Sequence, residues 1–425
     1  MKSSWNSGWV RSKFPALMPE NSLSPLFLDN PGGTQLPDSV INAMSAYCRT
    51  SCANVGGMYA TSETTECLIT STRQAIADLF NVPLPHSIIF GPNMTSLTFH
   101  VAEALRKTIK PGDEIVVTRL DHDANITPWL SLANEGAVIR WIDIKPHSGT
   151  LDIQSIENIL SVRTRWVAVT HASNVLGSIP DIALITKLAH SYGAMVYVDA
   201  THYVPHGPID VQELDCDFMV CSMSKAFGPH VGVLYGKLSA LEKLSPNKVS
   251  SAPDHLPRRW ELGTQNYEGI AGLLATIAYL EAIGKQHSPI LLAGNPVSRG
   301  QMLRNAMSAV RQYEMGLSAE LYDGLNTIQD IEIYGTRDCA DPRVPTLCFT
   351  LANISPCEIT RRLSSRSIYA CYGNFYATHL LQRLCIDIET GCARIGLVHY
   401  NTIDEIYCFV EALSELVRYA MVRKS

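Results

Sequence analysis

The residues best suited to chemistry in this sequence are an aspartate and a lysine, each at the end of a short apolar run. Asp199 ends one run and is followed closely by His202, and Lys225 ends the motif Ser-Met-Ser-Lys after the next run. Desolvation among small and apolar residues lowers the pKa of a lysine amine, which a Schiff-base nucleophile requires. Lysine is usually solvated, so Lys225 could also be an ordinary loop residue.

A further candidate is the turn Gly91-Pro92-Asn93-Met94-Thr95-Ser96, which follows an apolar run and opens a predicted helix. The first turn of a helix offers free N–H groups that bind phosphate, and here it also carries two hydroxyls. The turn therefore suits a phosphate cradle. Equally, Thr95 or Ser96 could simply cap the helix.

These residues need a scaffold, and an alternation of strand and helix patterns supplies one. The alternation predicts a mostly parallel seven-stranded sheet with helices on both faces, including Thr95–Lys107 and Ile182–Tyr192. Ligands of such sheets gather at the carboxyl ends of the strands, where the candidate residues lie. The predicted strands are Ser87–Phe90, Glu114–Thr118, Val138–Ile144, Trp166–Thr170, Met195–Val198, Phe218–Cys221 and Gly232–Leu234.

The pattern changes in the last third of the chain. We predict a large domain at 20–290 and a smaller α+β domain at 291–425, against which the segment 1–19 packs. Two helical stretches, Tyr267–Ile283 and Gln301–Gln312, precede the smaller set of elements. Its predicted strands are Glu332–Tyr334, Thr346–Leu351 and Arg394–Val398, and its helices are Pro356–Ser364 and Asp404–Val422.

Composition narrows the class of protein. The 425 residues are 46% hydrophobic and 17% charged, with a formal net charge of -6, which describes a globular chain without a basic footprint for nucleic acid. The N-terminus has no apolar signal region, and no apolar stretch reaches the roughly 20 residues that cross a bilayer. The 12 cysteines are scattered without zinc spacing. We therefore expect no metal, no membrane span and a reducing, cytoplasmic location.

The order and spacing of the candidates resemble the class V aminotransferases of pyridoxal-phosphate (PLP) fold type I, and most closely the cysteine desulfurase-like group. The resemblance runs from about Phe27 to Leu416. It implies an α/β enzyme with PLP as cofactor that works as a homodimer. Three motifs carry it: Asp121-His122-Asp123-Ala124-Asn125-Ile126-Thr127-Pro128-Trp129, Thr170-His171-Ala172-Ser173-Asn174-Val175-Leu176-Gly177 and Gly263-Thr264-Gln265-Asn266.

The resemblance also implies roles for single residues. Lys225 would hold PLP as an internal aldimine and carry the Cα proton, Asp199 would pair with the pyridine nitrogen, and His122 would stack on the ring. His202 stands where desulfurases usually have glutamine. The other implied cofactor contacts are Asn174 and His202 near the 3-oxygen, Met94, Thr95, Ser222 and Ser224 at the phosphate, and Thr264 reaching the phosphate from the partner subunit.

On the substrate side, Arg394 resembles the arginine that grips the α-carboxylate in a bidentate fork, which implies a small α-amino acid as substrate. Asn174, Tyr376 and Asn30 are expected beside it. Without the other motifs, Arg394 could be an arginine on the surface of a strand of the small domain.

Two departures from the desulfurase pattern bear on function. In the loop 369–377, Tyr376 stands where desulfurases carry their catalytic cysteine, and Cys371, five residues earlier, is interpreted as a buried small hydrophobe. The segment 54–59 has Gly56 and Gly57 in place of a His-Arg pair, which should widen the pocket.

These departures favour an enzyme of specialised metabolism that joins an amino-acid carbanion or enamine to an aldehyde, with Tyr376 as the oxyanion donor. A lyase reaction is the second type of chemistry that we predict. The alternatives are an aminotransferase, a C–S lyase or desulfurase-like enzyme, an epimerase, and a catalytically silent PLP-binding homologue.

Overall fold

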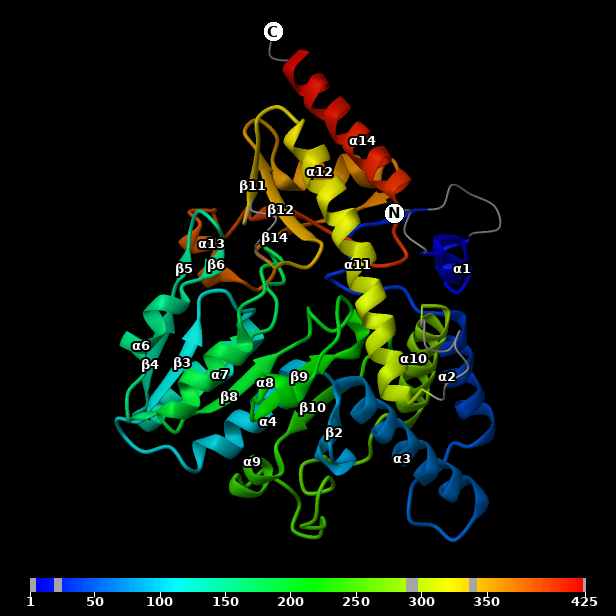
Figure 1. The fold of residues 1–425 in the computed structure, drawn as a ribbon, viewed down its shortest axis with the longest axis vertical. Helices are drawn as coiled ribbons and strands as arrows, with labels where there is room; N and C mark the ends of the chain where they lie inside the picture. The colour runs from blue at the N-terminus through cyan, green and yellow to red at the C-terminus, as the bar shows by residue number, and fades with distance from the viewer. Residues whose placement is uncertain (1–4, 19–24, 288–296, 336–341, 423–425) are drawn as a thin grey trace.

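The computed structural model describes residues 5–18, 25–287, 297–335 and 342–422, and its centre is a seven-stranded sheet (Figure 1). The strand order is β2-β10-β9-β8-β7-β3-β4, and β10 is antiparallel to both of its neighbours. The remaining neighbours pair in parallel. The mostly parallel seven-stranded sheet is thus confirmed. Its strands are β2 (Ile88–Gly91), β3 (Glu114–Thr118), β4 (Val138–Ile142), β7 (Thr164–Thr170), β8 (Met195–Asp199), β9 (Phe218–Ser222) and β10 (Gly232–Gly236).

Alternation along each strand divides the sheet between two apolar cores, because successive side chains point to opposite faces. On β8, Val196 and Val198 belong to one core and Tyr197 to the other. The second face is covered by α4 (Met94–Arg106), α5 (Thr127–Leu130) and α9 (Leu238–Lys243). The first is covered by α2 (Asp38–Thr50), α3 (Ala60–Phe80), α6 (Ile156–Ile159), α7 (Ile182–Ser191), α8 (Val211–Leu214) and α10 (Tyr267–Gln286).

A smaller, fully antiparallel sheet lies beyond the first, in the order β11-β12-β15-β14. Short strand pairs accompany it: β1 (Leu26–Phe27) with β13 (Ile368–Tyr369), and β5 (Ile144–Lys145) with β6 (Thr150–Leu151). The sheet strands are β11 (Ile331–Tyr334), β12 (Thr346–Leu351), β14 (Cys371–Gly373) and β15 (Cys392–Gly396), and the helices beside them are α12 (Pro356–Ser364), α13 (Thr378–Arg383) and α14 (Ile403–Val422).

One long helix, α11 (Arg299–Asn326), joins the two cores and runs past the sequence-predicted end at Gln312. Its early residues, such as Leu303, lie in the core of the large sheet, and its later residues, such as Leu321, lie in the core of the small sheet (Figure 1). The predicted domain boundary between residues 290 and 291 lies outside the described residues. Because α11 contributes to both cores, the two sheets share a structural element.

The N-terminal segment packs against both parts of the molecule, and not only against the small domain as predicted. Helix α1 (Ser7–Arg11) ends with Arg11, which forms an ion pair of 2.7 Å with Glu405 of α14. The Phe14 ring packs edge-on against Tyr279 of α10, with 5.4 Å between ring centroids. The segment therefore contacts the last helix of each core.

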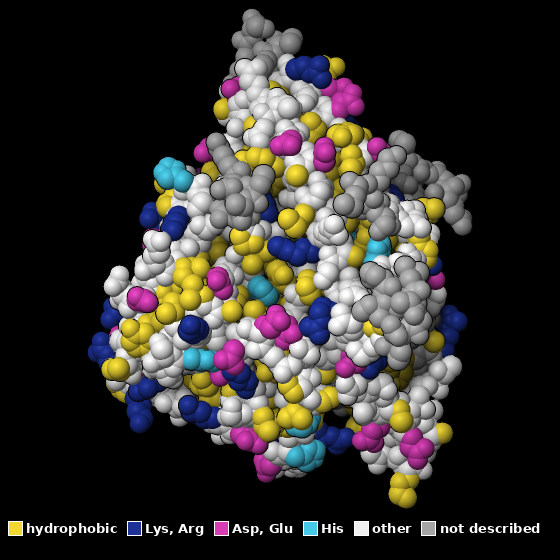
Figure 2. All heavy atoms as spheres, viewed as in Figure 1, with side chains coloured by type: hydrophobic (Ala, Val, Ile, Leu, Met, Phe, Trp, Pro, Cys, Tyr) yellow, Lys and Arg dark blue, Asp and Glu magenta, His cyan; other side chains and the backbone are white. Residues whose placement is uncertain are grey.

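The surface mixes charges of both signs. Figure 2 shows acidic and basic side chains interspersed over the viewed face, with apolar side chains gathered near its centre. In the part of the chain that the structure describes, no helix is both long enough and apolar enough to span a bilayer.

Candidate active site

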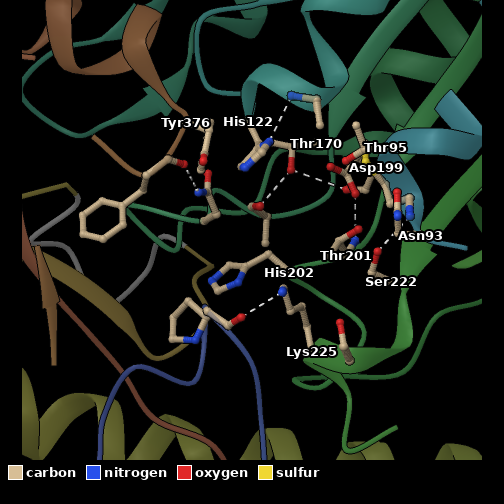
Figure 3. Close-up of a pocket in the computed structure, with 18 of the residues that line it drawn as sticks. Asn93, Thr95, His122, Thr170, Asp199, Thr201, His202, Ser222, Lys225 and Tyr376 are labelled. Carbon is tan, nitrogen blue, oxygen red and sulfur yellow. Dashed lines mark hydrogen bonds between the residues drawn. The ribbon is translucent and has the colours of Figure 1, made fainter. Parts of the chain in front are cut away.

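A cavity of about 450 Å³ opens at the carboxyl ends of the large-sheet strands, and its size lies in the roughly 300–1,000 Å³ typical of small-molecule sites. Strands β8 and β9 deliver Asp199 and Ser222 to it, and the turn after β9 delivers Lys225. In Figure 3, Asn93, Thr95 and Ser222 lie together near Asp199, while His122 and Tyr376 lie on the opposite side. Parallel strands thus gather the residues that the sequence separates.

Lys225 ends a 3₁₀ turn (Met223–Lys225) and its Nζ points into the cavity, where it donates to the Gly32 carbonyl at 2.8 Å (Figure 3). Burial lowers the pKa of its amine, and the positive charge of Arg394 lowers it further. A lysine in this setting carries a larger share of neutral, nucleophilic amine than a surface lysine does. The solvated-loop alternative is therefore wrong for Lys225.

Asp199 is 5% exposed, and no ion pair to it forms within the described residues. Its Oδ1 accepts from the Thr201 N–H at 2.9 Å. Burial raises the pKa of this carboxyl to about 6. Asp199 is consequently a carboxylate that would gain from a cation placed in the cavity.

His122 precedes a 3₁₀ turn and lines the cavity, and its Nδ1 accepts from the Ala124 N–H at 3.0 Å, which restrains the ring. Burial, then the charges of Arg394 and Lys225, lower the pKa of His122 to about 4, so the ring is neutral. The Tyr376 ring lies 5.5 Å from it, centroid to centroid. Tyr376 itself is 69% exposed and has a φ of 54°.

The helix start at the phosphate-cradle candidate is capped by Asn93, whose Oδ1 accepts from the Ser96 N–H at 2.9 Å. Thr95 therefore does not cap α4, and it lines the cavity. Ser222 accepts from the Met94 N–H at 2.8 Å, which ties β9 to α4. These groups and Ser224 together line one end of the cavity.

Arg394 lies on β15 and reaches the cavity from the small sheet. Its Nη1 donates to the Asn174 carbonyl at 3.1 Å, and its Nη2 pairs with Asp29 at 2.8 Å. The guanidinium also stacks on the Phe375 ring, with Cζ 4.0 Å from the centroid. With its side chain 6% exposed, Arg394 is not the surface arginine of the alternative interpretation.

Asn174 and His202 line the cavity as expected. The Asn174 Nδ2 donates to the Phe375 carbonyl at 3.0 Å, and its Oδ1 has no partner among the described residues. His202 Nε2 lies 2.9 Å from Thr346 Oγ1, and burial lowers the pKa of its ring well below the usual value. His202 is therefore a neutral, anchored ring.

For Asn30 the structure corrects the sequence-based assignment to the substrate. Its side chain is 3% exposed, and Nδ2 donates to the Gly396 carbonyl at 2.7 Å and to Asn401 Oδ1 at 3.1 Å, while Oδ1 accepts from Tyr400. Buried by these partners, Asn30 does not line the cavity. Its neighbour Asp29 lines the cavity instead.

Thr264 and the paired glycines lie elsewhere on the chain's own surface. Thr264 does not line the cavity that holds Lys225. It lines two other cavities, one of which also contains Asn54 and Val55 in its lining. Gly56 and Gly57 do not line the Lys225 cavity, so they do not widen it within one chain. Within its own chain, Thr264 therefore does not reach the cavity that holds Lys225.

Sequence reasoning missed two contributors and misjudged a third. Asp29 and Phe375 hold Arg394 from both sides, and neither follows a recognisable strand of the large sheet. Cys371 lines the cavity and is only half-buried, contrary to the interpretation as a buried hydrophobe. Burial and the neighbouring Asp29 charge raise the pKa of its thiol. The only signal for Asp29 was its position beside Asn30.

The residues present fit PLP. The buried Asp199 carboxylate suits a protonated ring nitrogen, the neutral His122 ring suits stacking, and the helix start at Thr95 suits a phosphate. Asn174 Oδ1, buried and without a described partner, adds a polar group for the ring substituents. Among the described residues, no group of three or more His, Cys, Asp or Glu side chains is arranged to hold a metal ion.

Comparison with known proteins bears this out. The family model "Aminotransferase class-V" matches residues 26–289 and 301–409. The "Aminotransferase-like protein FGM3" of Gibberella zeae is 30% identical over 421 residues, which is 97% of this chain and 98% of that protein. A "Cysteine desulfurase" of Escherichia coli O8 is 30% identical over 426 residues, covering 96% of this chain and 98% of its own.

Solved structures agree in fold. The cysteine desulfurase CsdA of Escherichia coli has a TM-score of 0.83 at 26% identity and covers 98% of this chain and 99% of its own. The apo cysteine desulfurase of Thermococcus onnurineus NA1 has a TM-score of 0.85 at 26% identity, with the same coverage. A C-DES mutant with glycine covalently linked to PLP shares the fold at 22% identity, a TM-score of 0.76 and coverage of 95% and 99%. The chain therefore belongs to the class V aminotransferase family of PLP-dependent enzymes, with PLP fold type I and cysteine desulfurase-like relatives.

Proposed function

We propose that this enzyme joins a carbon atom of a small α-amino acid to a carbonyl co-substrate such as an aldehyde, in specialised metabolism. The observation that carries the proposal is Tyr376, a phenol beside His122 at the mouth of the cavity, in the loop where the desulfurase pattern has a thiol. A phenol cannot accept sulfur from a substrate. It can donate a proton to an oxygen that gains negative charge.

Lys225 and Asp199 are the residues to which we assign the first step. When bound, PLP withdraws electrons from the α-carbon of the amino acid. Lys225 attaches the cofactor and, once substrate has displaced it, accepts the Cα proton at Nζ, for which its lowered pKa is suited. Asp199 keeps the ring nitrogen protonated, because a buried carboxylate stabilises a cation at that point.

The other cofactor contacts follow from the walls of the cavity. We assign the phosphate to the end with Thr95, Met94, Ser222 and Ser224, where a helix start and hydroxyls face the cavity. His122 covers the ring. Asn174 and His202 address its 3-oxygen side.

Arg394 is the group to which we assign the α-carboxylate of the substrate, because its fork matches a carboxylate and its guanidinium is held by Asn174 and Phe375. The new C–C bond forms between the nucleophilic carbon and the carbonyl carbon. The carbonyl oxygen takes its proton from Tyr376, and the proton that Lys225 removed from the amino acid returns through solvent to the phenolate, so that the product is the sum of the two substrates.

The runner-up is an aminotransferase, which the similarity to the aminotransferase-like protein of Gibberella zeae favours. The names of the desulfurase relatives favour C–S bond cleavage. An epimerase remains a further alternative. A silent PLP-binding protein is disfavoured, because Lys225, Asp199 and Arg394 all face one cavity.

The test is a screen of free amino acids, alone and with aldehydes, against the purified holoenzyme. Cα deuterium exchange together with a new product of summed mass is the expected result. Accumulation of pyridoxamine phosphate would establish the aminotransferase instead. A stoichiometric persulfide after incubation with cysteine, lost in Cys371→Ser, would show desulfurase chemistry at Cys371 and overturn the proposal. No spectral change with any amino acid would favour the silent homologue.

We further propose a cytoplasmic homodimer. The free cysteines among the described residues suit a reducing compartment. The dimer rests on Thr264, which the family resemblance assigns to the phosphate and which lies outside the Lys225 cavity of its own chain.

A further inference from the structure

The carboxylate-binding arginine already carries a carboxylate from its own chain. Asp29 Oδ1 lies 2.8 Å from Arg394 Nη2, and the Asp29 side chain is 33% exposed while that of Arg394 is 6% exposed. Both residues line the cavity. A ligand that approaches Arg394 therefore meets the negative charge of Asp29 beside the arginine.

The backbone holds Asp29 at this point. An isolated parallel β-bridge joins Asp29 to Gly396 on β15, two residues beyond Arg394. The Gly32 N–H donates to the Asp29 carbonyl at 3.1 Å, and a Cβ on Gly32 would lie 2.7 Å from Asp29 Oδ2. Glycine at position 32 therefore leaves the room that the carboxylate occupies.

The cations of the cavity are few. Among the described residues that line it, Arg394 and Lys225 are the only arginine and lysine. His122 and His202 are neutral, since burial lowers the pKa of both rings. The lining also includes an exposed histidine, His230. Under the proposed function, Lys225 serves the cofactor and Arg394 the α-carboxylate, which leaves no arginine or lysine for a second carboxylate.

We propose that Asp29 is a specificity-determining residue, which excludes amino acids with acidic side chains. The α-carboxylate must share or displace the Asp29 contact at Nη2, and a side-chain carboxylate would add a third negative charge to the same wall. Like charges a few ångströms apart repel strongly in a partly buried site. The inference rests on the proposed function, because it takes Arg394 as the α-carboxylate site.

The experiment compares matched ligands that differ in one charge. Binding of glutamine against glutamate, and of asparagine against aspartate, is measured on the holoenzyme from the immediate change in the visible cofactor spectrum after mixing. We expect the wild type to bind each amide at least about tenfold more tightly than its acid. In Asp29→Asn the acids should gain most, so that the ratio falls to about twofold or less.

Control variants separate charge from shape. Asp29→Glu keeps the charge and should keep the preference, and Asp38→Asn removes a carboxylate at the start of α2, outside the cavity, and should change nothing. Should Asp29→Asn fail to fold, as judged by its melting transition, Asp29→Ser replaces it. A wild type without the preference for amides, or an Asp29→Asn or Asp29→Ser variant that retains it, would overturn the proposal.

Arg394→Gln distinguishes this failure from a failure of the proposed function. If Arg394 binds the α-carboxylate, this variant weakens all four ligands. Weakened binding in Arg394→Gln together with an unchanged ratio in Asp29→Asn would reject the role of Asp29 alone. Unchanged binding of all four in Arg394→Gln would reject the α-carboxylate site and, with it, the basis of the inference.

Discussion

The two walls of the cavity are built differently. The cofactor wall consists of strand ends of the large sheet, so Asp199 and Ser222 are fixed by pairing on both sides of their strands. The substrate wall consists of loops and a strand of the small sheet, where Asp29, Phe375 and Arg394 hold one another. The carboxyl ends of the strands hold the residues that the cofactor requires in fixed positions. The sequences of the loops, in contrast, can vary with the substrate.

Substitutions in the cofactor wall should therefore lower activity more than substitutions in the substrate wall. Lys225→Ala should lose the borohydride-reducible link to PLP and lower the rate of Cα proton exchange by on the order of 10³-fold or more, since the variant lacks both the attachment point and the base. Mass spectrometry after reduction checks the link, and deuterium exchange checks the rate. A reducible adduct at another lysine would contradict the assignment.

Asp199→Asn should act next most strongly, and in two measurable ways. In the holoenzyme, Cα exchange should slow by on the order of 10²-fold with the cofactor still bound. In the cofactor-free protein the same variant should be more stable than the wild type at pH 7. The pKa of Asp199 rises from 3.8 to about 6 on folding, so ionisation at pH 7 costs the native state roughly 3 kcal/mol.

The direction of the Asp199 pKa shift sets the pH range in which this difference in stability occurs. An acid with a raised pKa in the folded state stabilises that state below about pH 4 and loses this contribution as pH rises through about 6. The advantage of Asp199→Asn should therefore disappear below about pH 4. Burial, and the neighbouring charge of Asp199, raise the pKa of Asp121 to about 8, so the loss of that charge in Asp199→Asn also relieves Asp121 and adds to the gain at pH 7. Denaturant unfolding at pH 4 and pH 7 measures the difference in free energy of unfolding between Asp199→Asn and the wild type. An equal difference at the two pH values would contradict this prediction.

The same contrast explains what could be predicted from sequence. Apolar runs gave the seven strands and, with them, the place of Asp199 and Lys225, because side chains at the carboxyl ends of parallel strands must converge. Helix α4 and strand β12 also lie where periodicity put them. These elements rest on local patterns that each segment carries by itself.

The substrate wall depends on contacts that no local pattern carries. Asn30 and Asp29 are adjacent, yet Asn30 is held by Gly396 and Asn401 while Asp29 faces the cavity. Both residues follow β1, which pairs with β13, and Asp29 itself bridges to Gly396, so their orientation depends on contacts more than 300 residues away in the chain. The predicted end of α11 was short for a similar reason, because its second half packs on the small sheet.

Damage to the substrate wall should be milder and more selective. Tyr376→Phe should slow product formation with an aldehyde by about tenfold while Cα exchange with the amino acid alone stays within about twofold, because the hydroxyl serves only the second substrate. The ring stays beside His122 in this variant. Equal losses in both assays would show that Tyr376 acts before the carbonyl arrives, and would weaken the contrast between the walls.

The smallest expected effect belongs to Thr264, which in the proposed homodimer would come from the second chain to the cofactor wall. Thr264→Val should weaken PLP binding by several-fold, about the value of one lost hydrogen bond to a charged group. The decisive measurement is a mixture with Lys225→Ala chains. In a hybrid dimer, the site with intact Lys225 receives Thr264 from its partner and should bind PLP as the wild type does. If that site stays as weak as in the Thr264→Val homodimer, Thr264 serves its own chain and the assignment across chains is wrong.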